Sequence, residues 1–119
     1  MIRVEVQVDG HGCVRQLVAT GHAPRSAPAA ISVACAAATC LLRTAGSTLA
    51  AEIGVTVDGA APTPGHFRLH VTAIAADRAD WVAGLTSFLV TGFRDLIRDY
   101  PGQVRMVVRT PKRSSTYGT

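Results

Sequence analysis

The chain opens with apolar residues at every second position: Ile2, Val4, Val6 and Val8. The positions between them are polar, and this period of two is typical of a strand with one buried face and one wet face. Residues 9–12 have the composition of a turn, and residues 13–19 return to a strand pattern. We therefore predict a hairpin at the start of the chain.

The regular pattern stops between Thr20 and Ile31, where two prolines stand among small residues, and we predict a loop there. Residues 32–48 are rich in alanine and predict a helix. Ser32 is a suitable first cap because its hydroxyl can accept a hydrogen bond from an amide two or three positions later. This start places Cys35 in the first helical turn. The residues expected on the inner face are Val33, Ala37, Cys40, Leu41 and Thr44.

Residues 53–57 predict a short strand, Asp58-Gly59 a turn and residues 60–65 a loop. Residues 66–72 alternate again, with Phe67 among the apolar positions and His66 and His70 on the solvated face.

A second helix is expected to start near Asp77 and Asp80, because acidic residues favour the first turn of a helix. Its apolar stripe from Trp81 to Ile97 predicts core or a dimer interface. Pro101-Gly102 ends this helix, and residues 104–108 predict a last strand.

The expected order is strand, strand, helix, strand, strand, helix, strand. This order predicts an α+β fold, with a small mixed β-sheet and two helices packed on it. We assign residues 1–109 to one domain and residues 110–119 to a mobile basic C-terminal tail.

Composition limits the class of protein. With 119 residues, 48% hydrophobic and 17% charged, the chain fits one compact soluble domain. We see no apolar run long enough to span a bilayer and no signal peptide, so we expect a cytoplasmic protein without a membrane partner. The net charge of +4 fits work near RNA, but a solvated basic tail also explains it. Nucleic acid is therefore expected as an indirect partner, if at all.

The three cysteines form no CxxC pair and no metal-ligand spacing with the histidines, so we expect no metal site and no cofactor. Cys35 and Cys40 are five positions apart, which places them about 140° apart around a helix and argues against a disulfide. Cys13 and Cys40 are expected in or near the core, as free cysteines usually are.

Cys35 and His22 are the candidate catalytic residues. A thiol becomes a nucleophile when its pKa is lowered, and a helix N-terminus and a nearby imidazole both do this. The amides of Cys35 and Ala36, at the predicted helix start, are candidate donors to an oxyanion. Gly21 would permit an unusual backbone angle just before His22. By spacing alone, however, a buried inert cysteine and an ordinary loop histidine are the commoner case.

The tripeptide Gly21-His22-Ala23, a short loop and the run from Val33 to Ala37 resemble the signature of the ribosomal-processing cysteine proteases. The resemblance extends over nearly the whole chain in length and element order. It implies a homodimer that removes an N-terminal extension from bacterial large-subunit ribosomal protein twenty-seven, cutting after an aromatic residue. It also implies that His22 and Cys35 form the catalytic dyad, with Gly21, Ala23, Ser32 and Thr39 around the substrate.

The chain departs from that family pattern at several points. Ser32 stands where members carry an Asp, Thr39 replaces a Ser, and Pro24 and Pro28 lie in a loop that is usually Gly-containing. The alternative is a non-catalytic or diverged ribosome-associated binding protein of the same fold. In that case the basic tail and the strand bearing His66, Arg68 and His70 would contact RNA phosphates. The aromatic content of 5% argues against stacking on bases.

Overall fold

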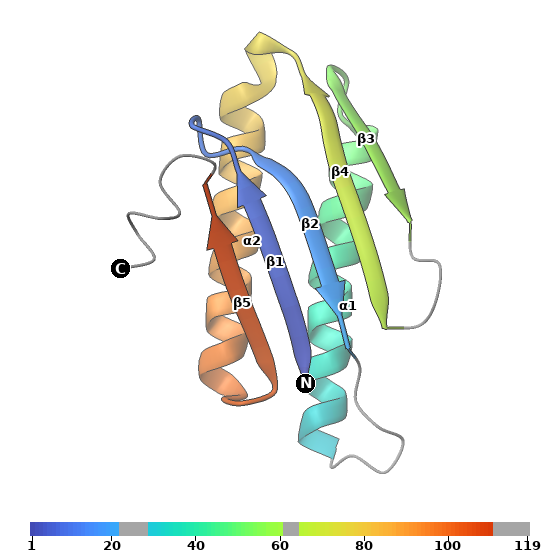
Figure 1. Ribbon diagram of the computed structural model, residues 1–119, viewed down its shortest axis with the longest axis vertical. Coiled ribbons are helices and arrows are strands. Elements are labelled where there is room, and N and C mark those ends of the chain that lie inside the picture. The colour runs from blue at the N-terminus through green and yellow to red at the C-terminus, as the bar shows by residue number, and fades with distance from the viewer. Residues whose placement is uncertain (22–28, 61–64, 111–119) are drawn as a thin grey trace.

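The computed structural model describes residues 1–21, 29–60 and 65–110, with side chains of the first helix from Val33 onward. The strands are β1 (Ile2–Val8), β2 (Val14–Thr20), β3 (Val55–Ala60), β4 (His66–Ile74) and β5 (Val104–Arg109). The helices are α1 (Ala29–Ala51), the single 3₁₀ turn η1 (Ala76–Arg78) and α2 (Ala79–Asp99). This order confirms the predicted α+β fold (Figure 1). The predicted tail, from residue 111 on, lies outside the described residues.

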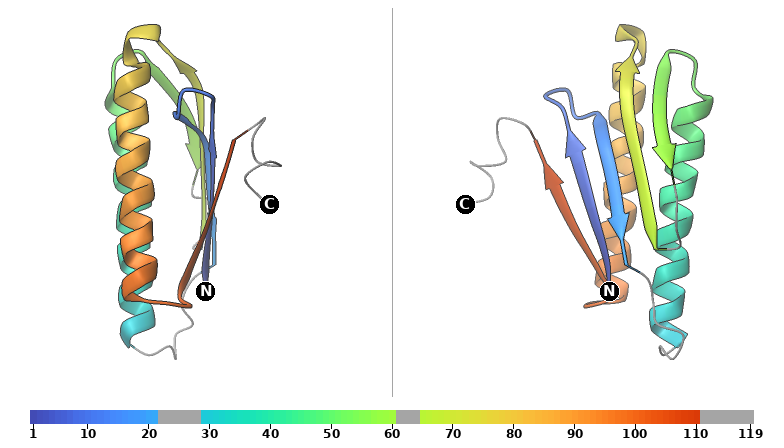
Figure 2. Two further views of the ribbon diagram at one scale, coloured as in Figure 1. Left: turned by 90° about the vertical axis from the view of Figure 1, so that its left-hand side faces the viewer. Right: turned by 45° about the vertical axis from the view of Figure 1, so that its right-hand side comes forward.

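The five strands form one mixed sheet in the order β3-β4-β2-β1-β5. β1 pairs with β5 in parallel, and the other neighbouring strands are antiparallel. Both helices lie on the same face of the sheet (Figure 2). The other face is covered by none of the segments that the structure describes. The domain therefore has two layers, one of helices and one of strands.

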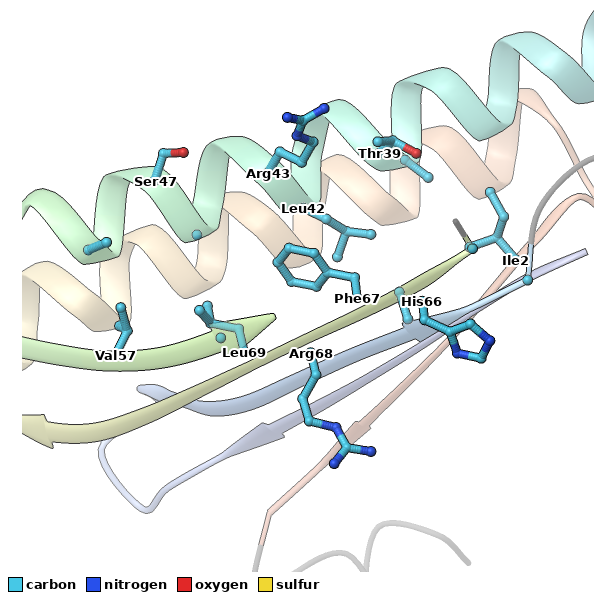
Figure 3. A pocket seen from close by; sticks show the side chains of 17 residues that line it. Ile2, Thr39, Leu42, Arg43, Ser47, Val57, His66, Phe67, Arg68 and Leu69 are labelled. Carbon is cyan, nitrogen blue, oxygen red and sulfur yellow. The ribbon is translucent and has the colours of Figure 1, made fainter. Parts of the chain in front are cut away.

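Successive side chains of the strands point to opposite faces, as the alternating sequence predicts. On β4, Phe67 points toward α1, whereas His66 and Arg68 point away from it (Figure 3). On β1, Ile2, Val4, Val6 and Val8 are buried against the helices. The alternation thus separates an apolar face under the helices from a polar face open to solvent.

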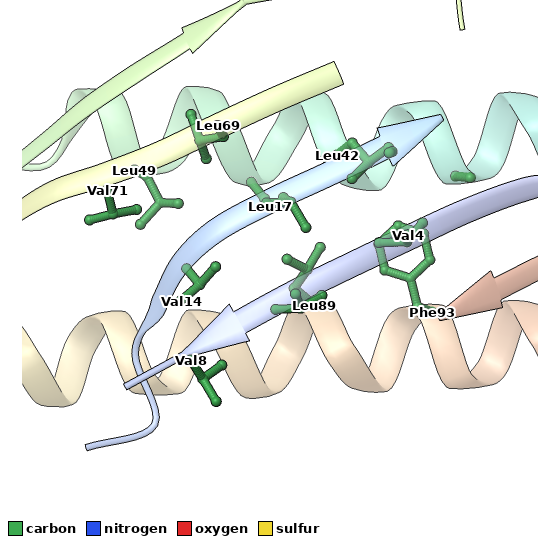
Figure 4. Close-up of a cluster of buried hydrophobic side chains, with 14 of the residues drawn as sticks. Val4, Val8, Val14, Leu17, Leu42, Leu49, Leu69, Val71, Leu89 and Phe93 are labelled. Carbon is green, nitrogen blue, oxygen red and sulfur yellow. The ribbon is translucent and has the colours of Figure 1, made fainter. Parts of the chain in front are cut away.

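The core fills the space between the two layers (Figure 4). Leu17, Leu49 and Phe93 are fully buried there, and each such side chain stabilises the fold by roughly 1.5–3 kcal/mol. Thr86 is the buried polar residue among the residues that the structure describes. Its hydroxyl accepts from the Val14 amide at 2.9 Å and donates to the Val82 carbonyl at 2.8 Å. The core polar group is therefore satisfied, and it ties α2 to β2.

The hairpin between β1 and β2 is fixed by Asp9. Its carboxylate accepts hydrogen bonds from the amides of His11 and Cys13 at 2.9 and 3.0 Å and pairs with Arg15 at 2.9 Å. Partial burial alone would raise the pKa of Asp9, but the donors from Cys13, Arg15 and His11 hold it below its usual value. Asp9 is therefore a structural carboxylate of the turn.

The alanine-rich helix differs from its prediction in where it starts and in which of its faces is buried. It begins at Ala29, so Ser32 lies inside the helix and is not its cap. Its buried residues are Ala34, Ala38, Leu42, Ala45 and Leu49, while Val33 is 49% exposed and Cys40 is exposed. The expected inner face was therefore wrong at Val33, Cys40 and Thr44, which are exposed, whereas Ala37 and Leu41 are partly buried against the core. Small apolar residues occur on every side of this helix, so its hydrophobic period carries little information about phase.

The stretch Val33–Ala51 of α1 has a mean hydropathy of 1.3. By length and composition this stretch is long and apolar enough to cross a membrane. This finding corrects the expectation that no such run exists. Core helices of soluble proteins pass the same test, and α1 packs on the sheet through its buried residues. Only 28% of the stretch is buried, however, so much apolar surface of α1 faces outward.

Candidate active site

Cys35 lies on α1, six residues after the helix begins at Ala29. Its side chain is partly buried and packs against the core. Its carbonyl oxygen accepts a hydrogen bond from the Thr39 hydroxyl at 2.8 Å, one turn further along the helix. Cys35 is therefore held on a rigid element, with part of its surface accessible to a substrate.

The position of Cys35 corrects the predicted oxyanion donors. Only the first four N–H groups of an α-helix lack partners within the helix. In a helix that begins at Ala29 these groups precede Ser32, so the amides of Cys35 and Ala36 have acceptors in the preceding turn. The helix start therefore supplies no free amides at Cys35.

A cleft of about 850 Å³ lies between α1 and the sheet (Figure 3). A volume of several hundred cubic ångströms is typical of a binding site. Its apolar wall consists of Leu42, Val57, Phe67 and Leu69. Thr39, Arg43 and Ser47 supply polar groups from α1. The cleft can therefore accept an apolar side chain and offers polar groups around it.

Cys35 lies on the same side of α1 as this cleft. The helix residues that line it include Ala38, Thr39, Leu42 and Gly46. Residues three or four positions apart share one face of a helix, so Cys35 continues this row by one turn toward the helix start. Cys40 lies on the other flank, in a separate groove between α1 and α2. The structure thus distinguishes the two helical cysteines by their surroundings.

Gly21 fixes the chain directly before His22. Its φ angle of +97° is one that side chains with a Cβ rarely adopt, and an added Cβ would overlap the carbonyl oxygen of Met1. Its amide donates to the carbonyl of Gly65 at 2.9 Å. Gly21 and Thr39 both line the cleft, so the chain enters the His22 segment at the cleft.

His22 and Ala23 lie outside the described residues, as does the side chain of Ser32. The structure thus brings together Gly21, Thr39 and the helical turn of Cys35, and contact between His22 and Cys35 stays a prediction. In the sequence we did not single out Arg43, Ser47 or Phe67 as site residues. Spacings of eight and twelve positions from Cys35 along one helix face could have indicated the first two.

In the ranges 1–21, 29–60 and 65–110, no group of three or more His, Cys, Asp or Glu side chains could hold a metal ion. Near the cleft, Cys35 supplies a half-buried thiol. Cys13 is a different case. It is 1% exposed, its thiol donates to the Ala79 carbonyl at 3.1 Å, and burial raises its pKa.

An α+β scaffold that carries a half-buried cysteine beside a peptide-sized cleft fits the class of small cysteine peptidases. The comparison of the sequence with known families establishes this class. The chain belongs to the cysteine protease Prp family, whose model matches residues 1–105. It is thus a cysteine-type peptidase, and the enzyme is favoured over the non-catalytic alternative. No curated protein matches the chain in sequence.

Solved structures share the fold at low sequence identity. SMU.848 from Streptococcus mutans matches with a TM-score of 0.76 and 20% identity, covering 92% of this chain and 95% of its own. The essential ribosomal processing protease Prp from S. aureus, with a covalently linked product peptide, matches with a TM-score of 0.71 and 18% identity. The complex of the same S. aureus protease with a substrate peptide matches with a TM-score of 0.72 and 16% identity. Each S. aureus match covers 92% of this chain and 100% of the other.

Proposed function

We propose that this protein is a cysteine endopeptidase that removes an N-terminal extension from bacterial large-subunit ribosomal protein twenty-seven. The family and the shared fold with a ribosomal processing protease support this proposal. The observation that carries it is the cleft that continues the helix face of Cys35. Ribosomes assemble in the cytoplasm, and we place the protein there.

Cys35 is the proposed nucleophile and His22 the general acid and base. The Cys35 sulfur attacks the scissile carbonyl while His22 takes the thiol proton, and His22 then gives this proton to the leaving amine. The intermediate is a thioester between Cys35 and the N-terminal extension, and the shortened ribosomal protein leaves as the amine. Water, deprotonated by His22, hydrolyses the thioester and regenerates the thiol. Gly21 positions His22 in this scheme, because its hydrogen bond to Gly65 fixes the preceding backbone.

The cleft is the proposed binding site for the residue before the cut. Phe67 and Leu69 from β4 and Leu42 from α1 form an apolar wall that suits an aromatic side chain. Gly46 lies beside this wall, with the Phe67 ring 3.5 Å from where its Cβ would be, which is an ordinary van der Waals distance. Thr39 and Ser47 offer hydroxyls to the peptide backbone. Ala23 and Ser32 complete the proposed substrate surroundings.

The test is a cleavage assay on purified ribosomal protein that carries its N-terminal extension, read by mass spectrometry. The wild-type protein should release the extension after an aromatic residue. Cys35→Ala and His22→Ala should each reduce the rate by at least about 1000-fold. Cys40→Ala is the matched control, because Cys40 lies on the same helix but faces the other groove, and it should cleave normally. Undiminished cleavage by Cys35→Ala would reject the nucleophile.

We also propose a homodimer, formed through the groove between α1 and α2. This groove has a volume of about 680 Å³, and its walls include Leu41, Trp81, Leu85 and Phe88. Phe88 is 76% exposed there, which is unusual for so large an apolar side chain. Asp80 is the only charged residue among its described lining, so two copies related by a two-fold axis could pair without burying like charges in its centre.

Sedimentation of the wild-type protein and of Phe88→Ser tests this interface. The wild-type protein should sediment as a dimer and the variant as a monomer at the same concentration. Phe88→Leu, which keeps an apolar side chain, is the control and should retain the dimer. A wild-type monomer at all concentrations would exclude the proposal.

A further inference from the structure

The face of the sheet that points away from the helices carries a cluster of basic side chains. β1 and β5 pair in parallel with Arg3 beside Arg105 and Gln7 beside Arg109. β2 and β4 pair with Thr20 beside His66 and Gln16 beside His70. Directly paired residues share a face, and Arg68 shares this face because it lies between His66 and His70 at alternate positions of β4. The six basic side chains on this face are exposed. We call this set the basic face: Arg3, His66, Arg68, His70, Arg105 and Arg109.

The acidic residues of the chain are mostly engaged elsewhere. Asp9 pairs with Arg15 in the hairpin turn, while Glu52 and Asp77 pair with Arg78. Asp95 and Asp99 pair with Arg98 on α2. Glu5 and Asp58 are the carboxylates left on the strands, and both lie on the basic face, because Glu5 pairs with Val18 and Val107 and Asp58 pairs with His70. In the described part of the chain neither forms an ion pair with the four arginines, so positive charge stays in excess on this face.

Folding alone does not explain the position of these arginines. Like charges directly opposite one another on neighbouring strands destabilise a sheet. Arg3 and Arg105 are such a pair, and β1 and β5 bring them together from the two ends of the chain. A bound anion would convert this repulsion into attraction for both guanidinium groups. The pair therefore points to an anionic ligand.

The size of the basic face indicates a ligand with several anionic groups. Neighbouring strands lie about 4.8 Å apart, so Arg68 and Arg105, which are separated by β2 and β1, span about 14 Å across the sheet. Arg105 and Arg109 are four positions apart on one strand, or about 13 Å. A single phosphate cannot contact all of these groups, whereas a polyphosphate backbone can.

We infer that the basic face binds RNA through its phosphate groups, without reading its sequence. Phe67 points to the other side of the sheet, and no aromatic residue of the described strands accompanies the arginines, so bases have no ring to stack on. Gln7, Gln16 and Thr20 provide further donors on the same face. The choice of RNA among polyanions rests on the proposed ribosomal function. The RNA would lie across the sheet from α1. His66 and Arg68 belong both to the basic face and to the lining of the cleft, whereas Arg3, Arg105 and Arg109 do not line the cleft.

Fluorescence anisotropy with a short labelled RNA hairpin tests this inference on the full chain without peptide substrate. The wild-type protein should bind at about 50 mM salt, with an affinity that falls steeply as salt rises. The double variant Arg3→Gln/Arg105→Gln should bind at least about tenfold more weakly and reduce the slope of log affinity against log salt by about 2. Peptide cleavage by this variant should be unchanged, because neither residue lines the cleft.

Arg94→Gln/Arg98→Gln is the matched control, because it removes the same charge from α2 on the other layer. It should retain at least half of the wild-type affinity for RNA. An equal loss in both double variants would show attraction by net charge alone and overturn the inference. Absence of wild-type binding at low salt, or stronger binding to vesicles of anionic lipid than to RNA, would also overturn it. None of these outcomes depends on peptidase activity, which is measured separately.

Discussion

The hydroxyl of Thr39 donates a 2.8 Å hydrogen bond to the carbonyl oxygen of Cys35. This bond links the helical turn of the proposed nucleophile to a residue that lines the cleft. Thr39 therefore connects the two parts of the site, the thiol and the surface that receives the substrate.

Thr39→Val should lower the rate of peptide cleavage by about fivefold, since a hydrogen bond of this kind contributes about 1 kcal/mol. Thr39→Ser keeps the hydroxyl and should stay within about twofold of wild type. Steady-state kinetics on a peptide that spans the cleavage site would measure both. Equal rates for the valine and serine variants would show that the hydroxyl has no part in the site.

Gly21→Ala should destabilise the protein by about 1–3 kcal/mol, because alanine is strained at positive φ and its Cβ would overlap the Met1 carbonyl. Cleavage should fall as well, since the backbone before His22 is displaced. Gly10→Ala is the control, because nothing lies within 4 Å of an added Cβ and its φ is not positive. Urea denaturation of the two variants should separate them clearly, and equal stabilities would contradict the fixed position of Gly21.

Acid should destabilise the hairpin through Asp9. The pKa of Asp9 is lowered from 3.8 in the folded protein, so its stabilising contribution is complete above that value and is lost as the pH falls through the lower folded value. Asp9→Asn should therefore lower the melting temperature at neutral pH and reduce its dependence on acid pH. Asp95→Asn, on exposed α2, should change neither by much. Thermal unfolding followed from neutral to strongly acid pH provides the measurement.

The cysteines should react with iodoacetamide in a defined order in the native protein. Cys40 is exposed in the single chain and lines the proposed dimer groove, so it should be labelled readily in the Phe88→Ser monomer and more slowly in the wild-type dimer. Cys13 is 1% exposed, and its raised pKa leaves less thiolate at mildly alkaline pH, so it should be protected until the protein unfolds. Peptide mapping by mass spectrometry distinguishes the sites. Labelling of Cys13 as fast as Cys40 would mean that the packing of β2 on α2 opens readily.

The strand layer could be predicted well from the sequence except at β3, which continues to Ala60 through Asp58 and Gly59, where we expected a turn. The alanine-rich helix could not be predicted as well. Alternation on β1 and β4 fixes both the strand and its buried face, because a shift by one residue would bury Arg3 or Arg68. On α1 a shift by one residue would exchange one apolar residue for another, for example Val33 for Ala34, so the hydrophobicity of the buried face would change little. The phase and the start of that helix are therefore set by packing on the sheet.

The site was predictable only in part for a related reason. Gly21, Thr39 and Cys35 could be chosen from the local pattern and the family resemblance. Phe67 enters the cleft through the pairing of β4 with β2, which no local pattern shows. Arg3 and Arg105 become neighbours through the parallel pairing of the first strand with the last.

This parallel pairing also determines when the domain can be completed. Synthesis delivers β1 first and β5 last, and contacts between distant segments form late because closing a long loop is costly. Until β5 arrives, β1 has a partner on only one side and exposes an open hydrogen-bonding edge. Truncation before residue 104 would therefore leave a strand edge able to pair with other chains. The last strand thus protects the nascent protein from aggregation as well as completing its sheet.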